Sequence, residues 1–268
     1  MASHRRVVCG GGKNGSTPIS VPQGGAGEVL EHRKSHWLTT HATTAIDAKH
    51  DAVFGMAFYA MRVLGELLSI GVGTSVLGRL GLRTILEVHI SLRFLLGKDD
   101  QTLWRRWRTF GAGQAKLNSL RFDNALEAPK YLNIENIERI ASEDIWEEFL
   151  AINIGSWSGL DLRRLSEQSG VKDTYDKYYS WTSGYVHGTW GPVRESCFVT
   201  CGNPLHPLHR YPESNTLPDA VDDATMLVDS ILDDLERAYP GFSRRLIVKG
   251  ADNPSSTTST PPCATNSQ

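Results

Sequence analysis

Apolar residues recur three and four positions apart along most of this chain, which is the period of an amphipathic helix. The clearest run lies in the C-terminal third and contains Val221, Ala224, Val228, Ile231, Leu235 and Ala238. No stretch of convincing length alternates apolar and polar residues as a half-buried strand does. The pattern therefore predicts an all-α fold, a helical bundle, formed by residues 28–249 as a single domain.

Start and stop signals divide the predicted bundle into helices. We expect helices over residues 28–38, 41–70, 75–96, 100–121, 143–154, 160–169, 173–187 and 218–239, with an irregular connection over 189–217. The helix over 41–70 turns apolar on most faces after Ala52 and is expected to lie centrally. Residues 1–27 and 250–268 are rich in Gly or in Ser, Thr and Pro, so disordered tails are predicted there.

Charge and cysteine content narrow the functional classes. The net charge is −2, whereas a surface devoted to duplex nucleic acid normally brings a basic excess, so duplex DNA is not an expected partner. The most apolar runs are interrupted by charged residues such as Arg62 and Glu66, which argues against a membrane span. Four cysteines imply no disulfide framework, so a reducing cytoplasm is the expected location.

Hydroxyl groups and one imidazole are concentrated between residues 173 and 188. Tyr175, Tyr179, Ser183 and His187 recur every four residues and would form one column on a helix, with Gly188 as its stop. Tyr178, Trp181 and Tyr185 form a second stripe that is expected to face the core. Two interpretations stay open: an aromatic packing helix whose polar groups find buried partners, or a pocket with His187 at its mouth.

A pair of opposite charges interrupts another apolar helix. Arg83 and Glu87 lie four residues apart within LRTILEVHISLRFLL, and a lone buried charge there would be very costly. The pair is either structural, or Arg83 lines the same pocket as His187 and receives an anion such as a phosphate. We hypothesise that Arg83 and Glu87 face the column of Tyr175, Tyr179, Ser183 and His187.

Metal-ligand residue types occur at two further places. Cys197, Cys201, His206 and His209 have the ligand types of a zinc site, but the two histidines are one residue too close for the common finger pattern. Asp47, His50 and Asp51 supply one copy of a carboxylate and histidine element that di-metal bundles use twice. Neither pattern is complete, so no zinc, other metal or cofactor is expected.

Two charged runs are expected to be ordinary helix surfaces. In the run Trp104-Arg105-Arg106-Trp107-Arg108, the two tryptophans fall on one helical face and leave the arginines outward, which favours amphipathic packing over base stacking. The acidic residues of the last helix are expected to form a solvated face. They are Asp219, Asp222, Asp223, Asp229, Asp233 and Asp234.

Several of these elements occur in an order that resembles a known family. Arg83-x3-Glu87 is followed by Trp157-x-Gly159, by Arg164-Leu165-x-Glu167-x2-Gly170, and by the Tyr175-to-His187 column. This order resembles the uncharacterised, all-helical, mostly bacterial family catalogued as domain of unknown function 5677, over roughly residues 40–240. The Ser183-x3-His187 helix end is in turn similar to HEPN ribonucleases, helical bundles common in toxin and phage-defence systems.

The HEPN resemblance implies a chemistry but lacks one of its residues. HEPN active sites pair the histidine with an arginine four to six residues earlier, and this chain has Ser180, Trp181 and Thr182 near that position. The resemblance would make His187 the general base of a metal-independent endoribonuclease, with Arg83 as our inferred replacement for the missing cation. Two hypotheses follow: an RNA-directed effector in defence or stress, or a non-catalytic helical module that binds a protein or ligand. The sequence leaves self-association open.

Overall fold

The computed structural model describes residues 26–42, 45–122, 129–143, 156–206 and 208–241 of the 268-residue chain. The helices are α1 (Ala26–Thr40), α2 (Ala48–Ile70), α3 (Val76–Lys98), α4 (Gln101–Phe122), α5 (Ile134–Glu143), α6 (Leu162–Gln168), α7 (Lys172–His187), α8 (Trp190–Cys197) and α9 (Val221–Ala238). Two three-residue strands, β1 (Phe198–Thr200) and β2 (Arg210–Pro212), complete the described elements. The all-α prediction is confirmed. The two predicted disordered tails fall largely on residues outside the described part.

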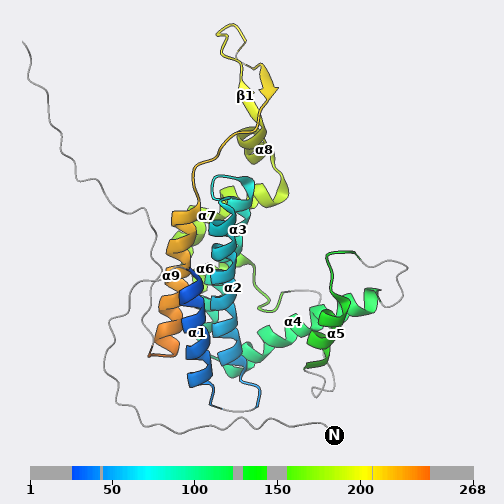
Figure 1. Cartoon of the computed structure of the whole chain (residues 1–268), viewed down its shortest axis with the longest axis vertical. Helices are drawn as coiled ribbons and strands as arrows, with labels where there is room; N and C mark the ends of the chain where they lie inside the picture. The colour runs from blue at the N-terminus through cyan, green and yellow to red at the C-terminus, as the bar shows by residue number, and fades with distance from the viewer. Residues whose placement is uncertain (1–25, 43–44, 123–128, 144–155, 207, 242–268) are drawn as a thin grey trace, which may run out of the picture.

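The core forms where α2, α3 and α9 pack together, with α7 and α6 against α3 (Figure 1). The spacing that predicted the last helix is the spacing of its buried face, since Ala224, Val228, Ile231 and Leu235 are all fully buried. Burial of each of the three larger side chains, Val228, Ile231 and Leu235, contributes roughly 1.5–3 kcal/mol to stability. The amphipathic pattern is therefore the direct cause of the α9 packing.

Helix ends follow their capping residues. The Ser75 hydroxyl accepts a hydrogen bond from the Leu77 amide at the start of α3, and Gly188 ends α7 in the left-handed conformation, as the sequence predicts. The start of the central helix was predicted wrongly at residue 41. Asp47 caps it by accepting from the His50 amide, so α2 begins at Ala48.

The region over 189–217 departs most from prediction, because it contains α8 and an antiparallel hairpin rather than an irregular connection. Strands of three residues are too short to show alternation, which explains why they were missed. The hairpin and α8 form an arm that projects from one end of the bundle (Figure 1). Close packing of α8 on α7 depends on Gly184, where an added Cβ would lie 2.9 Å from Pro192 Cγ.

A second extension is formed by α4 and α5, which pack on each other to one side of the bundle (Figure 1). Trp104 is fully buried while Arg105 and Arg106 are exposed, so the amphipathic interpretation of this segment is confirmed. The sequence missed α5, and the helix predicted over 143–154 falls almost wholly outside the described residues.

One described helix, α2, is long and apolar enough by length and composition to cross a membrane. In this structure α2 packs against α1, α3, α4 and α9, and residues along its whole length are buried by them. Its apolar character is accounted for by this central position.

Candidate functional site

The charged helix α3 and the tyrosine helix α7 lie against each other, as hypothesised. The guanidinium carbon of Arg83 lies 4.3 Å from the centre of the Tyr179 ring, in a cation–π contact. Tyr179 is stacked on Tyr175, with ring centres 4.4 Å apart and planes 20° from parallel. Burial, followed by the neighbouring Tyr179, raises the pKa of Tyr175. Arg83 thus meets the face of the aromatic column rather than its hydroxyl groups.

Arg83 also forms an ion pair with Glu87 on its own helix. The Arg83 side chain is 11% exposed, whereas that of Glu87 is 53% exposed. The carboxylate therefore reaches from solvent toward a cation that is already covered by Tyr179. The Nε atom of Arg83 is buried and has no hydrogen-bond partner in the described part of the chain. With its charge balanced at this position, Arg83 has the contacts of a structural residue.

The remaining members of the predicted site lie elsewhere on α7. Ser183 is half-buried, and His187 is exposed at the C-terminal end of the helix. Eight residues separate Tyr179 from His187, which corresponds to about 12 Å along a helix. Within the described residues, Arg83 contacts Tyr179 and Glu87, and neither Ser183 nor His187 shares a hydrogen bond or ion pair with them. The structure therefore brings together three of the five residues, Arg83, Glu87 and Tyr179.

The second stripe of α7 is only partly buried. Tyr178 donates to Asp223 of α9 and Tyr185 donates to Glu195 of α8, each at 2.6 Å. Burial is the main cause that raises the pKa of both phenols, and the carboxylate partner adds to it. Trp181 was expected in the core, but it is 53% exposed. Its indole donates to Glu195 at 3.0 Å, and its ring covers Gly191 of α8.

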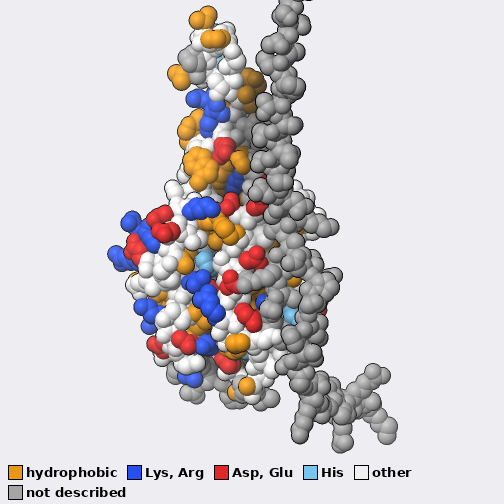
Figure 2. All heavy atoms as spheres, turned by 90° about the vertical axis from the view of Figure 1, so that its left-hand side faces the viewer, with side chains coloured by type: hydrophobic (Ala, Val, Ile, Leu, Met, Phe, Trp, Pro, Cys, Tyr) orange, Lys and Arg blue, Asp and Glu red, His pale blue; other side chains and the backbone are white. Residues whose placement is uncertain are grey.

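Hydrophobic side chains stand out on the surface of the projecting arm (Figure 2). The exposed large ones at the end of α7, in α8 and in the hairpin are Trp181, Val186, Trp190, Leu205, Leu208 and Tyr211. The Trp190 ring lies next to Phe198, and the guanidinium carbon of Arg210 lies 5.7 Å from its centre. We call Trp181, His187, Trp190 and Arg210 the arm surface. It combines open aromatic rings, a cation and the imidazole of His187.

Sequence reasoning missed two of these residues, Trp190 and Arg210, because it expected no structure over 189–217. A usable signal was present at the start of α8. Thr189 is an N-cap residue type, and Pro192 follows within the first turn, where proline is tolerated. The position of Arg210 beside Trp190 had no local signal, since it depends on the hairpin.

A groove of about 320 Å³ lies between α2, α3 and α4. Its walls are mostly apolar, and it is lined by Gly55, Met56, Tyr59, Glu87, Val88, Ser91 and Trp107. Of the five predicted site residues, only Glu87 reaches it. This groove is therefore separate from the helix end that carries His187.

The other clusters that the sequence suggested have structural partners. Asp47 caps α2, Asp51 forms an ion pair with Arg108, and His50 lies 3.0 Å from the Thr40 hydroxyl, so these three are not arranged as metal ligands. The acidic face of α9 is not wholly solvated, because Asp234 is almost fully buried. Asp234 forms ion pairs with Arg93 of α3 and with Arg237.

Comparison with known proteins places these elements in a family. The model of a family of unknown function, DUF5677, matches residues 67–200, which is half of the chain. The chain belongs to this family. The DUF5677 segment contains α3 to α8, and therefore Arg83, Glu87 and the tyrosine column with His187. The helices α1 and α9 and the second strand of the hairpin lie outside it. No curated protein and no solved structure matches the chain.

Proposed function

We propose that this protein is a helical module that binds single-stranded RNA through its arm surface and does not cleave it. The observation that carries the proposal is the exposed Trp190 ring, with the Arg210 guanidinium carbon 5.7 Å from its centre. His187, which is also exposed, precedes Trp190 by three residues in the chain. Proteins that hold single strands commonly stack bases on aromatic side chains and grip the backbone with nearby cations. The HEPN resemblance adds the expectation of a role in defence or stress, and the low cysteine content adds that of a cytoplasmic location.

Charge around the arm is compatible with this proposal. Residues 186–212 contain two arginines, Arg194 and Arg210, and one glutamate, Glu195, within a chain of net charge −2. Glu195 accepts hydrogen bonds from Trp181 and Tyr185, so its carboxylate is turned toward α7. Glu213, whose amide donates to the Cys197 carbonyl, follows β2 directly and makes the arm close to neutral overall. A neutral arm with a local cation suits a short single strand better than the long phosphate track of a duplex.

The position of Arg83 does not favour cleavage. Catalysis requires the acting groups to lie within hydrogen-bond reach of the same atoms. Arg83 is covered by Tyr179, balanced by Glu87 and about two helical turns from His187. These contacts give Arg83 a structural role and leave it out of reach as the cation that cleavage by His187 would need.

A direct test measures RNA binding and RNA integrity with the same samples. Fluorescence anisotropy with a labelled single-stranded RNA is expected to show binding by the native chain. Trp190→Ala should raise the dissociation constant by about 5- to 150-fold, which corresponds to the loss of one stacking contact. Tyr131→Ala serves as the matched control, because Tyr131 is an exposed aromatic residue before α5. Gel analysis is expected to show intact RNA with both proteins.

Three results would contradict the proposal, and the first is that the native chain binds no RNA. Equal binding by the native protein and Trp190→Ala would remove the arm surface as the RNA site. RNA cleavage that disappears in His187→Ala would establish the catalytic alternative instead. Leu205 and Leu208, both exposed at the hairpin tip, favour a second candidate, a protein-binding arm. That candidate is supported if the native chain binds no RNA at all.

A further inference from the structure

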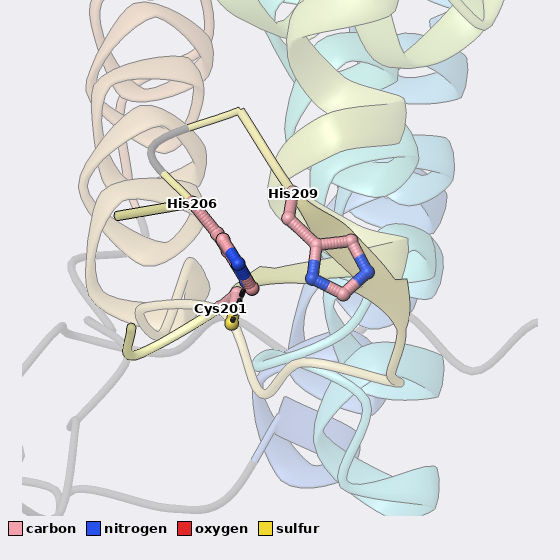
Figure 3. Close-up of side chains that lie close together, drawn as sticks. All are labelled: Cys201, His206 and His209. Atoms are coloured by element: carbon pink, nitrogen blue, oxygen red, sulfur yellow. Dashed lines mark hydrogen bonds between the residues drawn. The ribbon is translucent and has the colours of Figure 1, made fainter. Parts of the chain in front are cut away.

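The hairpin of the arm gathers one thiol and two imidazoles at its tip. The Cys201 sulfur and one ring nitrogen each from His206 and His209 all lie within 4.8 Å of one another. Figure 3 shows the three side chains close together. The Cys201 sulfur lies 4.0 Å from His206 Nδ1. The sequence predicted no metal here because of the spacing of these residues along the chain. Their arrangement in space, however, brings three metal-ligand atoms together.

Backbone hydrogen bonds of the hairpin hold the three residues in this arrangement. Thr200 pairs with Arg210 in the strand register, and the next amide, that of Cys201, donates to the His209 carbonyl at 2.9 Å. In the loop, the His206 amide donates to the Asn203 carbonyl at 2.9 Å and the His209 amide donates to the His206 carbonyl at 3.0 Å. The hairpin therefore places His209 directly across from Cys201, and a turn brings His206 to the same side.

The distances are close to those of a tetrahedral zinc site. Zinc binds sulfur at about 2.3 Å and imidazole nitrogen at about 2.0–2.1 Å, so neighbouring ligand atoms around it are about 3.5 Å apart. Closing the cluster from its widest separation of 4.8 Å requires shifts of about 1 Å. Rotations of the side chains supply such shifts, because both histidines are exposed and Cys201 is only half-buried.

The ligand types select the class of ion. A thiolate with two neutral imidazoles suits a borderline-soft divalent ion such as Zn²⁺, whereas Mg²⁺ and Ca²⁺ prefer oxygen ligands. Cys197 is not part of the cluster, since it lies before β1 at the other end of the strand. The site has three protein ligands and leaves a fourth position open to solvent. This differs from the four-ligand zinc finger that the sequence spacing excludes.

We propose that Cys201, His206 and His209 bind one zinc ion at the tip of the arm. Binding requires the Cys201 thiol to release its proton to solvent, after which the thiolate and the two imidazoles each form one bond to the metal. Water completes the tetrahedron. All three ligands lie beyond residue 200, where the match to the family ends, and the proposal is independent of RNA binding.

The experiment uses the full chain with Cys9 and Cys263 replaced by serine, so that Cys197 and Cys201 are the only thiols. After removal of metal with a chelator, Zn²⁺ is titrated in competition with a chromophoric chelator. Co²⁺ is then used as a spectroscopic substitute. We expect one ion per chain, a tetrahedral Co²⁺ spectrum and a thiolate-to-Co²⁺ charge-transfer band.

Variants distinguish this site from accidental binding by a free thiol. Cys201→Ser is expected to lose the charge-transfer band. His209→Ala is expected to weaken Zn²⁺ binding by at least about tenfold, the lower bound seen when even an outer partner of a metal ligand is removed. Cys197→Ser is the matched control and should retain both the band and the affinity. Circular dichroism checks that each variant keeps its helices.

Three results would overturn the proposal. These are no saturable Zn²⁺ binding, a charge-transfer band that Cys197→Ser removes and Cys201→Ser retains, or a stoichiometry of one ion per two chains.

Discussion

Acid should destabilise this protein through one buried histidine of α3. His89 is 3% exposed, and both of its ring nitrogens lack a hydrogen-bond partner among the described residues. Burial, with a smaller effect from the Arg93 cation one turn away, lowers the pKa of His89 to about 4. An imidazole in this position stays neutral while the bundle is folded and takes up a proton once it unfolds.

The magnitude follows from the two pKa values. The pKa of His89 is about 4 in the folded chain and about 6.5 in the unfolded chain, so the unfolded state binds the extra proton between these values. The contribution of a neutral His89 to stability is fully present above about pH 6.5 and is lost as the pH falls toward 4. Between pH 7.5 and 4.5 this histidine should lower the free energy of unfolding by about 2 to 3 kcal/mol.

Urea unfolding at these two pH values, for the native chain and His89→Leu, isolates this contribution. On acidification, His89→Leu should lose about 2 to 3 kcal/mol less unfolding free energy than the native chain, because leucine does not titrate. At pH 7.5 it should be at least as stable as the native chain, since it removes buried polar atoms that lack partners. His187→Leu is the matched control, because it removes an exposed imidazole. Equal acid sensitivity of the native chain and His89→Leu would refute the reasoning.

Two further predictions concern ion pairs of α3. Arg83→Met should lower the free energy of unfolding by about 2 kcal/mol, because it removes a largely buried cation–π contact. Glu87→Gln should change the free energy of unfolding by about 1 kcal/mol or less, because Glu87 is half exposed. Urea unfolding checks this order, and a larger effect at Glu87 would contradict it. Burial raises the pKa of Asp234 to about 6 despite its two arginine partners, so ionising it weakens the fold as the pH rises from about 4 to 6. Asp234→Asn should remove up to about 3 kcal/mol of this loss of stability between pH 4 and 6. If the variant and the native chain show the same dependence of unfolding free energy on pH, the ion pairs of Asp234 outweigh the effect of its burial.

The sequence by itself determined the helices that have strong local signals. Apolar spacing predicted the buried face of α9, and Ser75 and Gly188 predicted helix ends, because a helix repeats every 3.6 residues and caps act on neighbouring amides. The Arg83 and Glu87 pair and the tyrosine column were also visible, since residues four apart share a helical face. All of this information lies within a few residues of the feature it predicts.

The tertiary structure alone decided which of these groups meet. The packing of α7 on α3 placed Arg83 on the Tyr179 ring and left His187 in solvent. Trp181 packs on α8 rather than in the core and stays about half exposed. The hairpin register brought His209 across from Cys201. Such contacts join residues far apart in the chain, or depend on which face of a helix a neighbour covers. The spacing of residues along one segment does not encode either.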